Sequence, residues 1–359
     1  MIKRKMIVLP AVLGLAVGNC WAQSSVTLWG VIDGGVSYVS NEGGGHSVKF
    51  DDGVVLPNLL KFTGQEDLGG GTKAVFDLTN QFSLGTGSFI PGQSLFSRLA
   101  YVGLEDARFG RLTFGNQYDF MFDSLVLGFN DAAYYTGLYS VRNGPFNNLA
   151  LPNNPTGAFD WDRTAGLSIS NSVKYQSPVF AGFSFGGMYG FGNVAGSIGA
   201  SNGSSFGLNY VMGAFGANAA YTLVKTATPV GQVSVRNWGV GAHYHLGPVT
   251  ANTLLTTVHN NQNGAGVWET EVGGLWQING PCSLLGAYSY MKGNAVLNND
   301  HAHQLTAMFQ YSLSKRTSVY SQVVYQWANE GANAQINGVF VPSSTSSQFV
   351  ARIGMTTQF

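Results

Sequence analysis

The chain has 359 residues and a formal net charge of zero, and only 10% of its residues are charged, against about 25% in an average soluble protein. It is rich in glycine, with 49 residues, and 13% of its residues are aromatic. So few charges disfavour a soluble surface, and no basic stripe in the sequence points to nucleic acid as a partner. This composition is typical of a β-barrel with one face in lipid and the other in water.

The first 22 residues have the three parts of a secretion signal. Basic residues occupy positions 3–5, an uncharged run follows at 6–17, and Ala22 ends a cleavage pattern. The uncharged run is shorter than the ~20 residues that a membrane-spanning helix needs. Asn19 disfavours the alternative, a lipoprotein signal with its lipid on Cys20. We therefore expect export with cleavage after Ala22, which leaves residues 23–359 as one barrel domain.

Residues 175–224 contain no charged side chain, which on hydropathy alone would suggest two transmembrane helices. The period contradicts that interpretation. Apolar residues lie at 206, 208, 210 and 212, and after a short turn at 215, 217, 219, 221 and 223. Side chains at i and i+2 share one face of a strand. The sequence therefore predicts a β-hairpin over residues 206–223.

The same alternation continues to the end of the chain, over residues 237–246, 304–313 and 349–359. In the last of these segments Phe349, Ile353 and Phe359 share one parity, and Arg352 lies on the other. Segments of ~10 alternating residues are long enough for a tilted strand to cross the hydrocarbon layer. We expect the apolar parity to face lipid and the polar parity to face water.

The connections between these segments alternate between tight and long. Residues 278–282 and 313–317 form short turns, whereas residues 329–347 form a long polar stretch, an asymmetry typical of outer-membrane barrels. With about 21 residues per strand and connection, residues 23–359 make about sixteen strands. Closure of an even number of strands pairs every backbone group within lipid. The predicted fold is an all-β, transmembrane antiparallel β-barrel of about 16 strands.

Six short motifs along the chain occur together in one known family. They are Ser25-Val-Thr-Leu-Trp-Gly-Val-Ile-Asp33, Gly64-Gln-Glu-Asp-Leu-Gly-Gly-Gly71, Phe96-Ser-Arg-Leu-Ala-Tyr-Val-Gly-Leu104, Phe114-Gly-Asn-Gln-Tyr118, Asn171-Ser-Val-Lys-Tyr175 and the terminal Phe359. In order and spacing they resemble Gram-negative general porins of the β-proteobacterial type. The resemblance implies a homotrimer of sixteen-stranded barrels in the cell outer membrane. Each barrel would be a water-filled channel for passive diffusion of ions and small hydrophilic solutes.

The resemblance also implies a third external loop that folds into the barrel, and the longest irregular stretch runs from Tyr118 to Ile169. In the family, acidic residues on this loop face basic residues on the barrel wall and form the pore constriction. Carried over by position, the candidate constriction residues are Arg98 of the Ser-Arg-Leu-Ala motif on the wall, and Asp131, Asp119, Asp123 and Arg163 on the loop.

Two further observations concern the basic wall. Arg98 shares parity with Ala100 and opposes Leu99, which we interpret as a position inside the lumen. Leu59 and Asn116, however, stand where relatives commonly have wall arginines. We therefore expect a thinned basic wall and weak ion selectivity, with less preference for anions than in typical relatives.

Three alternatives to a general diffusion porin remain open. The many aromatic residues between 120 and 161 would suit a substrate-selective channel that stacks sugars or aromatic compounds, although we favour the simpler interpretation that they pack the loop against the wall. A structural or adhesive surface barrel is a second alternative. An outer-membrane barrel enzyme is the third, but no nucleophile elbow, zinc-binding His pair or phosphate loop is present, so we predict no enzyme activity and no cofactor.

The histidines and the predicted partners complete the expectations from sequence. His243 and His245, like His301 and His303, lie on one face of a strand, but two imidazoles without a third ligand make a weak metal site, and we predict none. The resemblance implies three partners: further copies of the chain, outer-membrane lipid and lipopolysaccharide, and the barrel assembly machinery acting on the C-terminal strand that ends at Phe359.

Overall fold

The computed structural model describes residues 24–90, 94–154, 160–163, 168–229 and 231–359, so the predicted signal at 1–22 lies outside the described residues. Antiparallel strands form one sheet, and pairing of β1 with β17 closes it. The strands are β1 (Ser25–Glu42), β2 (Gly45–Asp52), β3 (Leu59–Gly69), β4 (Thr72–Gln81), β5 (Leu99–Asp106), β6 (Gly110–Gln117), β7 (Ile169–Gln176), β8 (Phe183–Gly190), β9 (Gly203–Met212), β10 (Phe215–Thr228), β11 (Gly231–Leu246), β12 (Val249–Asn260), β13 (Gly266–Gln277), β14 (Cys282–Gly293), β15 (His301–Ser312), β16 (Thr317–Ala328) and β17 (Ser347–Gln358).

Two of these elements, β2 and β3, are halves of one barrel strand. Both pair with β1, since Gly34 lies opposite Asp52 and Val31 lies opposite Leu59. Between the halves, residues 53–58 leave the ladder, and the Asp33 carboxylate holds them by accepting from the backbone N–H of Val54 at 2.8 Å. The barrel therefore has sixteen strands around its wall and one extra strand element, which confirms the predicted fold.

Alternating burial separates two faces on every long strand. In β16, Tyr320, Gln322 and Gln326 are buried, whereas Val323 and Tyr325 are exposed. The exposed parity is apolar, as a lipid-facing surface requires. The hairpin predicted over residues 206–223 is formed by β9 and β10, with Phe215 opposite Met212. No helix in the described part of the chain is long and apolar enough to cross a membrane.

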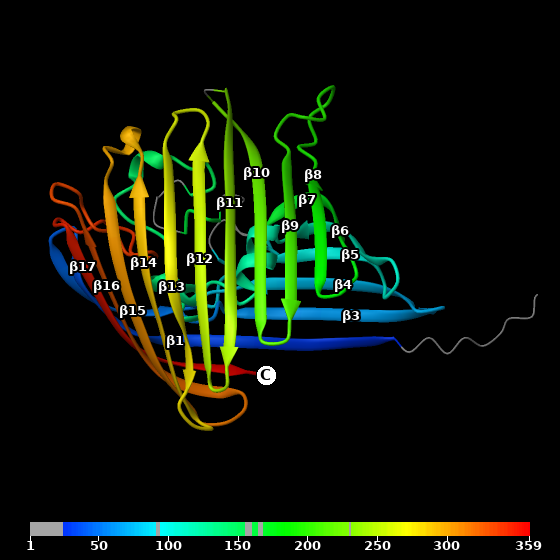
Figure 1. The fold of residues 1–359 in the computed structure, drawn as a ribbon, viewed down its shortest axis with the longest axis horizontal. Coiled ribbons are helices and arrows are strands. Elements are labelled where there is room, and N and C mark those ends of the chain that lie inside the picture. The colour runs from blue at the N-terminus through cyan, green and yellow to red at the C-terminus, as the bar shows by residue number, and fades with distance from the viewer. Residues whose placement is uncertain (1–23, 91–93, 155–159, 164–167, 230) are drawn as a thin grey trace, which may run out of the picture.

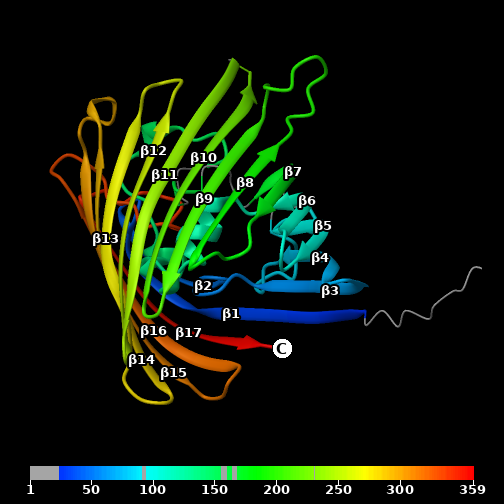
Figure 2. The same cartoon turned by 45° about the vertical axis from the view of Figure 1, so that its right-hand side comes forward.

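The connections differ between the two ends of the barrel. Turns such as 213–214 and 247–248 are short at one end, which we call the short-turn end, and both termini of the barrel lie there (Figure 1). Longer connections, including 82–98, 118–168 and 329–346, leave the other end, the loop end. Strands β9–β13 of the near wall cross β1 and β3–β5 of the far wall, as expected for tilted strands (Figure 2).

The chain end completes the closing seam. The Phe359 N–H donates to the Gly30 carbonyl at 3.0 Å, and the Gly30 N–H donates back to the Phe359 carbonyl at 3.0 Å. The Phe359 ring lies so close to Gly30 that a Cβ at residue 30 would collide with it. A side chain at residue 30 would therefore require the terminal ring to turn away from the seam.

Candidate functional site

The long connection between β6 and β7, residues 118–168, is called the third loop below. Its described elements are η1 (Met121–Val126), α1 (Ala132–Tyr135), η2 (Leu138–Ser140) and η3 (Asn147–Leu149). Its first turn packs against β9, β10 and β11. There the Phe120 N–H donates to Ser205 Oγ at 2.9 Å, and Asp119 Oδ2 accepts from Thr222 Oγ1 at 2.9 Å. Ser205 and Thr222 belong to the buried parity of their strands, so this loop contacts the face opposite to lipid.

Further along, the third loop is tied to strands on the far side of β10. The side chains of Gln304 and Gln322 donate to the carbonyls of Ser140 and Thr136, both at 2.5 Å. Four apolar loop residues pack into a buried cluster with the loop-end parts of β11–β15: Phe146, Leu149, Leu151 and Trp161. Along β9–β16 the loop therefore lies directly on the wall.

Asp131, the predicted loop acid, lies in the middle of this contact. Its Oδ1 caps α1 by accepting from the Tyr134 N–H at 2.7 Å, and its Oδ2 pairs with Arg142. Arg142 has four more acidic neighbours: Asp160 at 3.2 Å, Asp162 at 2.8 Å, Glu269 at 3.5 Å and Glu271 at 3.7 Å. No side chain in this arginine cluster is more than 10% exposed. Asp131 is thus a buried anchor of the loop.

Five carboxyl groups around one guanidinium cannot all be charged in a buried site. Burial raises the pKa of Asp162 to about 7, Arg142 opposes that shift, and the charge of Asp160 adds to it. The Glu271 carboxylate also accepts from the Ala132 N–H at 2.7 Å, which links β13 to the start of α1. The Arg142 ion pairs and the N–H donors of Ala132 and Ala133 hold the loop against β13.

Three other predicted residues meet near β7. Asp123 pairs with Lys174 of β7, and burial raises the pKa of the Asp123 carboxyl while Lys174 opposes the shift. Arg163 Nη1 lies 3.9 Å from Asp119 Oδ1, and its guanidinium carbon lies 4.4 Å from the centre of the Phe122 ring. The side chains of Asp123 and Arg163 remain 19% and 17% exposed, so both reach water.

Arg98 reaches the lumen for a different reason from the one predicted. In β5 it is Leu99 and Tyr101 that face the lumen, while Val102 is 59% exposed on the outer face. The parity argument was therefore wrong, because β5 begins only at Leu99. Arg98 precedes the strand, and its Nε donates to the side-chain carbonyl of Gln81 on the lumen face of β4.

The structure adds basic lumen residues that the motif comparison missed. Lys61 Nζ lies 2.7 Å from Asp77 Oδ2, and Arg111 Nη2 donates to the Tyr101 hydroxyl at 2.6 Å. Their side chains are 28% and 31% exposed. Alternation would have revealed Lys61, which lies between the apolar residues Leu60 and Phe62. The signal is weaker for Arg111, which lies between Gly110 and the outward-facing Leu112. Lys61 stands two residues after Leu59, on the same face.

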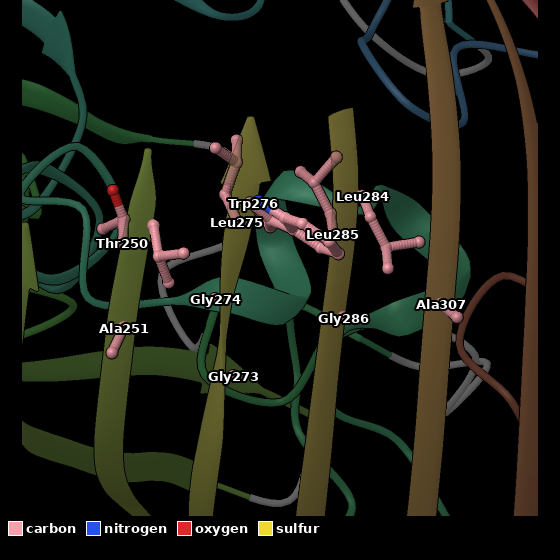
Figure 3. A pocket seen from close by; sticks show the side chains of 11 residues that line it. Thr250, Ala251, Gly273, Gly274, Leu275, Trp276, Leu284, Leu285, Gly286 and Ala307 are labelled. Carbon is pink, nitrogen blue, oxygen red and sulfur yellow. The ribbon is translucent and has the colours of Figure 1, made fainter. Parts of the chain in front are cut away.

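A groove on the barrel surface is lined by residues of β12, β13, β14 and β15 (Figure 3). Trp276 and Leu284 border the directly paired Gly274 and Gly286. Register and alternation place these four residues on the outer, apolar face, where the groove meets lipid. Among the described residues, no group of three or more His, Cys, Asp or Glu side chains is arranged to hold a metal ion.

The family model described as Gram-negative porin matches residues 11–331. The chain belongs to the Gram-negative porin family. It is 29% identical to outer membrane porin protein 32 of Delftia acidovorans, over 90% of this chain and 89% of that protein. It is 25% identical to an outer membrane porin protein of Bordetella pertussis, over 90% and 94% of the two chains.

Solved structures show the same fold. The anion-selective porin from Comamonas acidovorans superposes with a TM-score of 0.80 at 24% identity, covering 94% of this chain and all of that one. OmpT of Vibrio cholerae in its trimer form superposes at 0.64 with 12% identity, covering 94% and 99%. This porin is therefore a β-barrel of the outer membrane, and members of its family are channels through which solutes diffuse passively.

Proposed function

We propose that solutes pass between the third loop and the wall formed by β3–β7, where the loop narrows the water-filled path. Two observations support this route. Along β9–β16 most of the loop is packed on the wall through buried side chains, and only its surface around Phe129 stays exposed there. Across from it, the lumen side chains of Lys61 and Arg111 are about one-third exposed. In this arrangement Arg98, Asp123 and Arg163 border the constriction, whereas Asp119 and Asp131 hold the loop in position.

The charges along this path favour weak ion selectivity. Lys61 pairs with Asp77, Arg163 lies near Asp119, and Lys174 pairs with Asp123. Each pair offers both signs to a passing ion, so the net field stays small. Arg98 is the exception, because it donates to an amide oxygen rather than to a carboxylate.

We predict that the wild-type channel has a small reversal potential across a salt gradient in a planar bilayer, and that Arg98→Gln shifts it toward cations. A unit charge about 7 Å away in water changes an ion's energy by about 0.6 kcal/mol, which corresponds to an about threefold change in relative permeability. Lys315→Gln, in the exposed turn at the short-turn end, is the matched control and should leave the potential unchanged. Strong anion selectivity of the wild type would contradict the prediction.

The porin assembles, we propose, as a homotrimer. The family resemblance supports this, and the structural relative OmpT of Vibrio cholerae was solved in a trimer form. Single-channel recordings should then show conductance levels grouped in threes, and the unheated protein should migrate on a gel at three times the chain mass. Uniform single steps together with a monomer mass would contradict the trimer.

We propose that outer-membrane lipid and lipopolysaccharide contact the outer face of the barrel. On β10–β16 the outward-facing charged residues are all basic, namely Lys225, Arg236 and Lys292, and all lie toward the loop end. Basic residues at that level suit the phosphates of lipopolysaccharide.

At the other end, the terminal Phe359 packs on Gly30 within the last strand pairing, which suits a strand that the barrel assembly machinery closes last. We also propose that the chain is exported with its first 22 residues as a signal, which is cleaved after Ala22.

A purely structural or adhesive surface barrel is separated from a diffusion channel by liposome swelling. Proteoliposomes in an iso-osmotic solution of a small sugar should swell as the sugar enters, and vesicles without the porin should not. No swelling, with correctly folded protein in the vesicles, would contradict the channel.

A further inference from the structure

Phe129 of the third loop combines two features that each cost free energy. Its φ is 62°, in the left-handed region where a bulky residue is an outlier. The residue is nevertheless 54% exposed, so the unusual backbone does not serve to bury it. Strained backbone persists where the surrounding structure imposes it, and such positions cluster at binding sites.

Side chains from three strands impose this conformation. Asn252 of β12 donates to the Phe129 carbonyl. The next residue, Asn130, donates to Asn218 Oδ1 of β10 at 2.6 Å, and its Oδ1 lies 3.0 Å from His243 Nδ1 of β11. The turn is thus fixed to the lumen wall on both sides of Phe129, while the ring itself stays in contact with water.

The exposed ring is one half of a stacked pair. The Phe129 and Tyr135 rings lie 5.3 Å apart between centroids at an interplanar angle of 10°. The Tyr135 hydroxyl donates to the Val126 carbonyl at 2.7 Å, which orients the second ring. The centroid of the His243 ring lies 6.4 Å from that of the Phe129 ring, and the centroid of the His245 ring lies 5.1 Å from that of His243. Phe129, Tyr135, His243, His245 and Asn252 are called the aromatic platform below.

Two polar groups of the aromatic platform reach water: the exposed imidazole of His245 and the partly exposed amide of Asn252. The His243 ring is buried, with its Nδ1 on Asn130. The Asp131 carboxylate, four residues before Tyr135, is buried in its pair with Arg142. His243 and His245 precede the turn at 247–248, so the platform lies on the short-turn side of the third loop. Its chemistry suits a neutral ring with an apolar face and hydroxyl groups around its edge.

We propose that the aromatic platform binds neutral sugars in transit, with the apolar face of a pyranose ring on Phe129 and the sugar hydroxyls on the exposed His245 imidazole and the Asn252 amide oxygen. The inference rests on the proposed diffusion path and assigns a solute class to it. Binding at such a site is weak and reversible, so a sugar occupies the path briefly and interrupts the ion current.

The test measures the ion current of the full-length porin in a planar bilayer as maltotriose, a neutral trisaccharide, is added on the short-turn side. Wild type should show a current block that saturates with concentration. Phe129→Ala should raise the half-saturating concentration about fivefold, the factor that corresponds to a ring contact of about 1 kcal/mol. Phe129→Tyr should keep the wild-type value. Phe191→Ala removes a ring of a residue that is 41% exposed outside the platform and should change nothing.

Each outcome separates the sugar site from the diffusion channel. Normal ion current without saturable block, or equal block in wild type and Phe129→Ala, would overturn the sugar site and leave the channel intact. Block by benzoate but not by maltotriose would overturn the solute class. Absence of any ion current would instead contradict the proposed diffusion function. Protease resistance of the third loop at the wild-type level in both Phe129 variants excludes loss of the loop as the cause.

Discussion

Arg142→Met should release the third loop from the barrel wall while leaving the barrel folded. Arg142 is the cation shared by the buried carboxyls of Asp131, Asp160 and Asp162 on the loop and of Glu269 and Glu271 on β13. Breaking a buried ion pair by removing one partner costs about 3–5 kcal/mol, because the remaining charges are left without compensation. That is enough to detach a loop whose anchoring depends on this contact.

The measurements are current noise in single-channel recordings and the rate at which an added protease cleaves the third loop. Both should rise in Arg142→Met, whereas the β-sheet signal in circular dichroism should stay. Arg108→Met is the matched control, since Arg108 pairs with Asp106 in a turn where its side chain is 64% exposed. Adding Glu269→Gln and Glu271→Gln to Arg142→Met should restore part of the protease resistance. Unchanged cleavage in Arg142→Met would refute the anchoring role.

Protonation should strengthen the same anchor. The pKa of Asp162 is raised from 3.8 to about 7 by burial. A carboxyl with a raised folded-state pKa favours the anchored loop fully below its unfolded value, and that contribution is lost as pH rises through about 7. Protease cleavage of the wild-type third loop should therefore be slower at low pH than at high pH. In Arg142→Met the pH dependence should be steeper, because no guanidinium offsets the charged carboxylates.

The sequence predicts those features of this porin that depend on neighbouring residues within one strand. The lipid-facing parity of β9, β10 and β17 follows from alternation within each strand, because each residue is selected separately for lipid or water. The same local rule failed for Arg98, since it requires knowing that β5 begins at Leu99. Alternation also does not predict the break at residues 53–58, because the Asp33 carboxylate that holds this segment belongs to another strand.

The arginine cluster shows a different limit. Glu269 and Glu271 are two apart in an alternating segment, so the sequence places two carboxyls on one lumen face and implies a cation nearby. It does not say which cation, because Arg142 comes from a loop more than 120 residues earlier in the chain. The motif comparison singled out Asp131 for the pore, whereas its burial beside Arg142 makes it part of the anchor. Long-range pairing decides between these roles.

Arg352→Met should lower the stability of the barrel itself. Arg352 is fully buried in β17, where its Nη2 lies 3.2 Å from Asp33 of β1 and its Nη1 donates to Ser37 Oγ at 3.0 Å. It also pairs with Asp51 of β2 and donates to the Tyr320 hydroxyl of β16 at 2.9 Å. One side chain thus joins four strand elements at the seam where the first and last strands meet. We expect a loss of about 3–5 kcal/mol in the free energy of unfolding.

Urea unfolding in lipid vesicles, followed by the β-sheet signal, measures this loss. Arg316→Met is the matched control, because Arg316 lies in the exposed turn between β15 and β16 and should not change the midpoint. Asp33→Asn combined with Arg352→Met should lose less than the sum of the single losses, since the two side chains interact directly. The third loop should remain protease-resistant in folded Arg352→Met, because its anchor is Arg142. A wild-type midpoint in Arg352→Met would show that strand pairing alone closes the barrel, and that the buried arginine serves the shape of the lumen instead.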